Sequence, residues 1–143
     1  MNFEQFSLDR RIVAAIKTVG YTTPTSIQQQ AIPIVLKGHD VLGLAQTGAG
    51  KTAAFLLPIL HQLTQGPLRQ VRVLIVTPTR ELAEQIYEVS VDLGRNTKVS
   101  SVSMYGGVSK GPQVTALQRG AEIVVAYLGS LQNDVLSGEF YAN

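Results

Sequence analysis

An α/β fold with a mainly parallel sheet is predicted by three features of the sequence. Segments of helical and of strand character alternate along the chain, and apolar residues make up 45% of it while charged residues make up only 15%. The run at 71–76 is continuously apolar and rich in β-branched residues, which is typical of a strand covered on both faces. Alternating strands and helices are joined by right-handed crossovers, so the strands should run parallel.

Glycine, proline and capping residues mark the ends and bends of the predicted elements. Ser7 is a candidate helix cap, and Gly20, Gly66 and Gly94 follow runs with helical periodicity. Pro58 falls inside one predicted helix and should kink it, because it has no N–H to donate. Helices are expected at about 8–19, 25–36, 51–65, 80–93, 112–118 and 130–136, and strands at 40–44, 71–76, 99–104 and 123–126.

Composition places the chain among compact globular proteins. It has 143 residues, enough for one domain with a core, a net charge of +2, and no cysteine for disulfides or thiolate metal sites. No apolar run reaches the roughly 18 residues of a membrane span, and the first residues lack the layout of a secretion signal. We therefore expect no membrane association and a cytoplasmic location. The mild positive charge permits nucleic-acid binding without requiring it.

The most specific chemical motif is the glycine-rich run Ala45-Gln46-Thr47-Gly48-Ala49-Gly50-Lys51-Thr52, which predicts a phosphate-binding P-loop. Small residues let backbone N–H groups surround a triphosphate, Lys51 would neutralise its β and γ oxygens, and the Thr52 hydroxyl would hold Mg²⁺. The alternative is a plain glycine-rich turn, which the predicted strand before the run and the predicted helix after it disfavour. A nucleoside triphosphate with Mg²⁺ is therefore the expected ligand.

Two polar residues have alternative interpretations that spacing alone does not separate. Gln28 would complete a capping box with Thr25, or its side-chain amide would pair with an adenine edge through one donor and one acceptor. In one interpretation, Arg80 and Glu81 simply form the solvated first turn of a helix. In the other, Arg80 offers its guanidinium fork to a phosphate at the start of that helix, which Thr79 caps.

Four motifs in the chain resemble those of DEAD-box RNA helicases, and they occur in the family's order. They are Phe3 with Gly20–Gln28, similar to the Q motif; Ala45–Thr52, similar to motif I; Pro78-Thr79-Arg80-Glu81-Leu82-Ala83, similar to motif Ia; and Gly106-Gly107, similar to the GG element. The resemblance extends from residue 3 to about residue 126. Because four ordered matches are far more specific than a P-loop alone, the chain is identified as a member of this family.

The resemblance implies that residues 1–143 form part of the N-terminal RecA-like P-loop domain of an ATP-dependent RNA helicase. It implies that Gln28 reads the adenine and that Phe3 packs on its ring, which makes the site prefer ATP over GTP. It also implies that Tyr21 is an ATP-binding residue and that Lys51 and Thr52 serve catalysis. RNA would be held by its backbone, with little sequence preference. The residues implied in RNA binding are Pro78, Thr79, Arg80, Gly106, Gly107 and Gly129.

Two departures from the family pattern bear on activity. Tyr127-Leu128-Gly129-Ser130 opens a divergent tail at 127–143 where Thr-Pro-Gly-Arg is expected, so an arginine that would contact phosphate is replaced. The chain also reaches Asn143 before any Asp-Glu-Ala-Asp sequence, whose carboxylates would position Mg²⁺ and water. We therefore expect this chain to hold ATP without hydrolysing it. A P-loop strand that lacks its sheet neighbours would leave an open edge, which favours oligomerisation or strand exchange.

Three hypotheses about function follow from these motifs. The first is an ATP-dependent RNA helicase of which this chain is a part, and the second is a catalytically inactive nucleotide- and RNA-binding module. The third, a small kinase or GTPase, lacks an acceptor-binding signature and leaves Gln28 and the motif at 78–83 unexplained.

Overall fold

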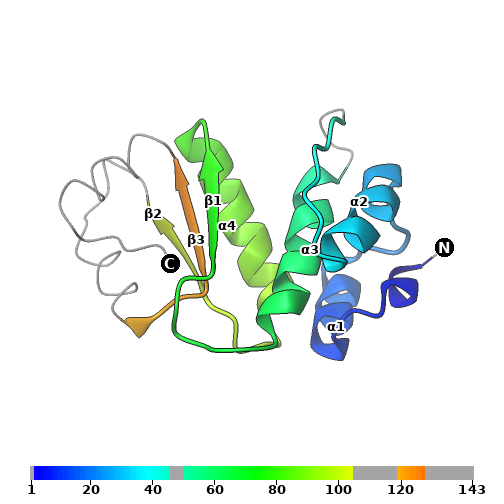
Figure 1. Ribbon diagram of the computed structural model, residues 1–143, viewed down its shortest axis with the longest axis horizontal. Helices are drawn as coiled ribbons and strands as arrows, with labels where there is room; N and C mark the ends of the chain where they lie inside the picture. Colours follow the sequence, from blue (N-terminus) through cyan, green and yellow to red (C-terminus); the bar gives the residue numbers. More distant parts are fainter. Residues whose placement is uncertain (1, 46–49, 105–118, 128–143) are drawn as a thin grey trace. The chain divides into compact units, whose positions relative to one another are not determined.

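The computed structural model describes residues 2–45, 50–104 and 119–127, and the chain divides into two compact units (Figure 1). The first unit comprises Met1–Gln65 with Asp92–Lys98, and the second comprises Gly66–Val91 with Val99–Asn143. The elements in chain order are the 3-10 helix η1 (Phe3–Phe6), α1 (Arg10–Val19), α2 (Ser26–Leu36), α3 (Lys51–Leu63), β1 (Val73–Thr77), α4 (Arg80–Gly94), β2 (Ser101–Met104) and β3 (Ile123–Tyr127). The helices predicted at 112–118 and 130–136 lie outside the described residues.

Apolar faces of three helices form the core of the first unit. α2 and α3 lie side by side, and α1 also contacts α3. Ile12 and Ile16 of α1, Ile32 of α2 and Leu56 and Leu60 of α3 are all at most 1% exposed. Pro58 is buried and lies inside α3, as predicted, and the helix continues past it to Leu63. The kink expected at Pro58 stays a prediction. Among the described residues, no helix is both long enough and apolar enough to cross a bilayer.

The start of α1 differs from the prediction, because Asp9 caps the helix and Ser7 does not. The Asp9 carboxylate accepts a hydrogen bond of 2.9 Å from the backbone N–H of Arg11 and two more of 3.0 Å from its guanidinium. Ser7 instead ends η1, in the left-handed conformation with a φ of 58°. Asp9 wins the capping position because its two carboxylate oxygens can bond the backbone and the guanidinium at once.

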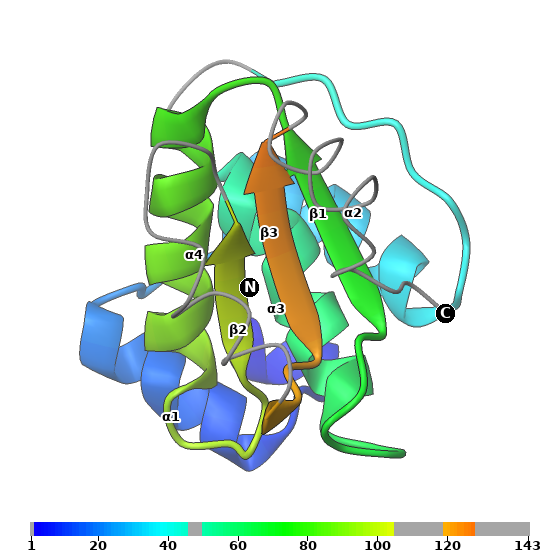
Figure 2. The ribbon, with the colours of Figure 1, turned by 90° about the vertical axis from the view of Figure 1, so that its left-hand side faces the viewer.

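A parallel sheet with α4 on one face forms the second unit, as the sequence predicted. The strand order is β1-β3-β2, and β3 pairs in parallel with both neighbours (Figure 2). The hydroxyl of Ser90 on α4 donates to that of Ser101 on β2 at 3.0 Å, so this side of the sheet faces the helix. On the opposite face of β1, Leu74 and Val76 remain exposed.

The strand predicted at 40–44 is not formed. Asp40 to Leu44 have no regular secondary structure, and Leu42 and Leu44 are 87% and 84% exposed. None of the described residues pairs with this segment, since the described sheet consists of β1, β3 and β2. The prediction was wrong because an apolar run alone does not form a strand, which exists only where a neighbouring strand accepts its hydrogen bonds.

Replacement of Asp9 should destabilise the protein in a pH-dependent way. The side-chain hydrogen bond from Arg11 is the largest cause that lowers the pKa of Asp9 below its usual value of 3.8. Its stabilising effect is therefore complete above the unfolded-state pKa and is lost as the pH falls through the lower folded-state pKa. Asp9→Ala should cost about 1 kcal/mol of unfolding free energy at pH 7 and less near pH 3. Urea unfolding at both values tests this, with Asp9→Asn as a control that keeps a capping oxygen; an equal loss at the two values would contradict it.

Candidate functional site

The start of α3, in the first unit, has the features of a candidate anion site. Gly50 is the N-cap residue, and Lys51 and Thr52 are the first two helical residues. Gly50 has no side chain with which to cap this end, and the first turn of α3 contains no acidic residue. The first backbone N–H groups of a helix lack intrahelical partners and carry its positive dipole end, so they favour a phosphate. Lys51, which is exposed, adds a full positive charge at the same end.

Gly50 is required where it stands, because it meets the start of α2. Its φ of +82° is left-handed, and a Cβ added to it would lie 2.5 Å from Nε2 of Gln28 and 3.0 Å from Oγ1 of Thr25. A side chain at this position would therefore be strained by the left-handed backbone and would displace the Gln28 amide from its contacts. Gly50 of the predicted P-loop is therefore seated directly against Thr25 and Gln28 of the predicted Q motif.

Gln28 completes the capping box that the sequence suggested. Its Oε1 accepts from the backbone N–H of Thr25 at 2.9 Å, and its own N–H donates to Thr25 Oγ1 at 3.5 Å. The side chain is 4% exposed and also donates from Nε2 to the carbonyl oxygen of Gly50 at 3.2 Å. The capping interpretation is confirmed, and the amide additionally links α2 to the P-loop. Adenine recognition by Gln28 stays a prediction.

The two predicted adenine-contacting aromatic residues lie together. Phe3 is 4% exposed. The centroids of the Phe3 and Tyr21 rings are 6.4 Å apart, with an angle of 29° between the ring planes. Phe6 contacts the Phe3 ring edge-on at 6.2 Å. Phe3 and Tyr21 line a cavity of about 310 Å³ whose other walls come from η1, α1 and the turn after α1. Gln28 is not among the residues that line this cavity.

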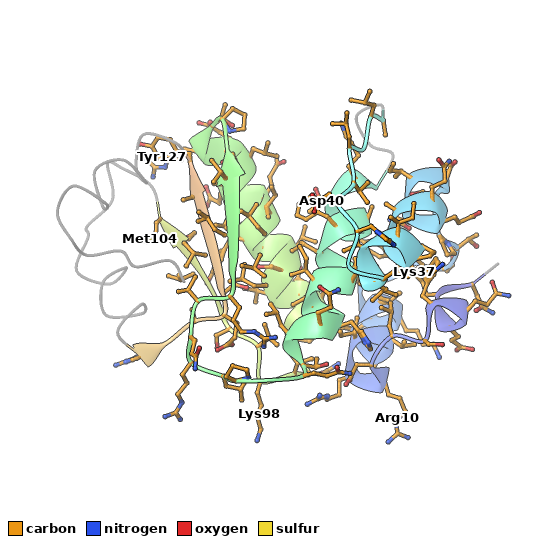
Figure 3. All side chains as sticks on the ribbon, viewed as in Figure 1. Arg10, Lys37, Asp40, Lys98, Met104 and Tyr127 are labelled. Carbon is orange, nitrogen blue, oxygen red and sulfur yellow. The ribbon has the colours of Figure 1, made fainter. Side chains whose placement is uncertain are left out.

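The carboxyl ends of the three strands define one edge of the second unit. Met104 and Tyr127, the last residues of β2 and β3, are labelled in Figure 3. At the end of β1, the Thr77 hydroxyl lies within hydrogen-bond distance of the carbonyl oxygens of Thr79 (2.9 Å) and of Ala126 (3.3 Å). This hydroxyl joins the turn before α4 to the neighbouring strand.

Thr79 caps α4, as predicted, and its neighbours lie at the same edge. Its Oγ1 accepts from the N–H of Leu82 at 3.2 Å, and Pro78, Thr79 and Arg80 are all exposed. An exposed guanidinium beside a capped helix start suits a phosphate. The remaining predicted site residues, Gln46–Ala49, Gly106, Gly107 and Gly129, lie outside the described residues.

Glu122 is a buried carboxylate whose role the sequence did not reveal. It stands at the amino end of β3 and is 1% exposed. Its Oε2 accepts from the N–H of Arg69 at 2.6 Å, and its Oε1 accepts from the N–H of Ser100 at 2.7 Å. The only sequence signal is a charged residue directly before an apolar strand run. Among residues 2–45, 50–104 and 119–127, no group of three or more histidine or acidic residues could hold a metal ion.

A helix start with a left-handed glycine and a following lysine, in a chain that also contains a parallel α/β unit, is typical of P-loop nucleotide-binding proteins. The DEAD/DEAH box helicase family matches residues 25–142, and the chain belongs to this family. It is 44% identical over 138 residues to DEAD-box ATP-dependent RNA helicase 40 of Oryza sativa subsp. japonica, covering 94% of this chain and 17% of that protein. It is 46% identical over 143 residues to the probable ATP-dependent RNA helicase ddx17 of Dictyostelium discoideum, covering 97% and 18%.

Solved structures agree with this assignment. A DEAD box protein from the hyperthermophile Methanococcus jannaschii is similar with a TM-score of 0.88 and 33% identity, covering 99% of this chain and 38% of that one. The fold is therefore that of a RecA-like DEAD-box helicase domain. The chain spans less than a fifth of the length of the two named helicases and less than two fifths of the solved protein.

Substitution of Gln28 should separate its capping role from its contact with the P-loop. Glutamate can also complete a capping box, but its carboxylate has no N–H for the carbonyl of Gly50. We expect Gln28→Ala to lower the unfolding free energy by about 1 kcal/mol, and Gln28→Glu to retain most of that stability while weakening ATP binding. Urea unfolding and ATP titration measure the two effects. Tight ATP binding by the Glu variant would contradict the assigned contact.

Proposed function

We propose that this chain is the ATP-binding, RNA-contacting N-terminal part of an ATP-dependent RNA helicase that unwinds or remodels RNA duplexes. The observation that carries the proposal is the uncapped start of α3, with Gly50 seated against Gln28, in a chain of the DEAD/DEAH box family. The names of the relatives support it, since the two described above are named ATP-dependent RNA helicases.

In this proposal the first unit holds the nucleotide. Lys51 neutralises the β- and γ-phosphate oxygens, and the first N–H groups of α3 donate to the phosphates. Thr52 holds the Mg²⁺ that accompanies ATP and withdraws charge from the phosphates. Phe3 and Tyr21 provide apolar surface for the adenine, and the amide of Gln28 selects adenine over guanine through its donor and acceptor. The adenine would have to share or replace the bonds that Gln28 makes to Thr25 and Gly50.

The second unit contacts RNA at the carboxyl edge of its sheet. Thr79 and the start of α4 offer backbone N–H groups, and Arg80 offers a guanidinium fork to the phosphates. Pro78 lies at the same edge. Gly106, Gly107 and Gly129, which lie outside the described residues, are proposed as RNA contacts on the family resemblance. Contacts of this kind hold the sugar-phosphate backbone, so the protein should discriminate little between RNA sequences.

Residues 1–143 would bind ATP without hydrolysing it. The acidic residues after the P-loop are Glu81, Glu84, Glu88, Asp92, Glu122, Asp134 and Glu139. The first four belong to α4, and Glu122 lies at the amino end of β3, away from the carboxyl edge. Asp134 and Glu139 lie outside the described residues. A catalytically inactive nucleotide- and RNA-binding module is therefore the alternative function for these residues alone. We further propose a cytoplasmic location, which suits a chain without cysteines.

Replacement of Lys51 by Ala tests the nucleotide site. Loss of its charge should weaken ATP binding by at least tenfold, while the exposed position of Lys51 predicts an unfolding free energy within about 0.5 kcal/mol of the unchanged chain. Isothermal titration with Mg-ATP measures the affinity, and we expect no RNA-stimulated phosphate release from either protein.

Lys37→Ala is the matched control, because this substitution removes the same charge from a residue at the end of α2 (Figure 3). Unchanged ATP affinity in Lys51→Ala would refute the P-loop assignment. Clear RNA-stimulated turnover by the unchanged chain would refute the proposal that it lacks a hydrolytic carboxylate.

We propose that the chain self-associates through the segment 40–44. Its support is the row of exposed apolar side chains there, since Leu42 and Leu44 are more than 80% exposed. An extended apolar segment without a strand partner is prone to pair with another chain. Light scattering should show a molar mass that rises with concentration, and Leu42→Lys should reduce it. Ile34→Lys, at a 42% exposed position on α2, should not. A monomer at every concentration would count against association.

A further inference from the structure

Arg69 has an unusual backbone conformation at the amino edge of the sheet, opposite the edge that carries Thr79 and Arg80. Its φ of 63° lies in the left-handed region, which glycine and asparagine adopt readily and arginine does not. In the described part of the chain, Ser7 is the one other non-glycine residue with a positive φ. Because such a conformation is strained, it persists only where the surroundings enforce it, and strain of this kind often marks a functional position.

Two neighbours hold the backbone of Arg69 in place. The buried Glu122 accepts its N–H at 2.6 Å. Gly120 lies so close that a Cβ added to it would be 2.6 Å from the Cα of Arg69. Gly120 directly follows Arg119 in the chain, so the backbones of Arg69 and Arg119 are brought together from positions 50 residues apart. The pair is part of a rigid edge of the sheet.

The two arginine side chains give this edge a positive charge. Arg69 and Arg119 are both exposed. Within residues 66–72 and 119–122, the only carboxylate is that of Glu122, which is buried and bonds to two backbone N–H groups. Arg72, by contrast, donates to the carbonyl of Pro67 at 3.3 Å and lies over Gly66, so it serves the fold. In these segments Arg69 and Arg119 are the cations available to an anion from solution.

We propose that Arg69 and Arg119 form a second contact for the phosphate backbone of RNA, at the amino edge of the sheet. This inference rests on the proposed RNA binding at the carboxyl edge and extends it. A guanidinium fork matches two phosphate oxygens at once, and two forks carried by adjoining backbones can hold neighbouring phosphates. A five-residue strand is roughly 16 Å long, so one RNA strand can reach both edges.

The test uses the chain with Arg69→Asn and Arg119→Gln together. Asparagine removes the charge and suits the left-handed backbone, so stability should be kept or raised. Affinity for a long single-stranded RNA should fall roughly tenfold at low salt. The slope of log affinity against log salt should flatten by about 1.4, for two lost contacts at about 0.7 each. ATP affinity should not change. Arg10→Gln with Arg95→Gln, in the first unit, is the control with the same net charge.

Three results would overturn the inference about Arg69 and Arg119, and a separate variant, Arg80→Gln, tests the proposed RNA site at the carboxyl edge. An unchanged RNA affinity in the Arg69/Arg119 variant would refute it, and so would an equal loss in the Arg10/Arg95 control. A loss of binding to polyglutamate but not to RNA would also refute it and assign the pair to an acidic protein. On a short RNA the variant should bind normally, whereas Arg80→Gln should weaken both lengths. If Arg80→Gln has no effect on either, the carboxyl-edge site itself fails.

Discussion

The carboxylate of Glu122 joins three chain segments that lie far apart in the sequence. Its two oxygens accept N–H groups from the loop before β1 and from Ser100, one residue before β2. The backbone carbonyl of Glu122 accepts from the N–H groups of Arg72 and Val73 at 3.0 Å, so the residue just before β3 also holds the start of β1. With both oxygens bonded to backbone N–H groups, the buried charge is compensated. Without Glu122, the segments that precede β1, β2 and β3 would lose the residue that connects them.

Fixing the beginnings of parallel strands also fixes their ends. The register places Thr77 beside Tyr127 and Met104 beside Ala126. The turn that carries Thr79 and Arg80 starts from that common edge, and the Thr77 hydroxyl ties it to β3. The proposed RNA surface is thus built on the rigid end of a sheet, although the contacts that align the sheet lie at its other end.

Local signals in the sequence predicted the elements that local interactions decide. The capping box at Thr25–Gln28 and the apolar runs at 71–76 and 123–126 each contain their own explanation, and the structure has a helix or a strand at each. The errors concern choices that depend on distant residues. The segment 40–44 has strand character but no partner to pair with, and nothing near Glu122 in the sequence identifies Arg69 and Ser100 as its partners. Asp9, and not Ser7, caps α1 because the guanidinium of Arg11 bonds to the Asp9 carboxylate. Helix periodicity contains no information about this contact.

The strand order has a consequence for how the chain acquires its structure. β3 is the last strand in the sequence and the central strand of the described sheet, so β1 and β2 have no contact with each other until it arrives. During synthesis, more than 40 residues must leave the ribosome after β1 before its first ladder can close. Such long-range closure is slow, and it leaves apolar strand edges open to other chains in the meantime. In the first unit, α2 and α3 are consecutive helices that pack together, so this pair can form before β3 has been synthesised.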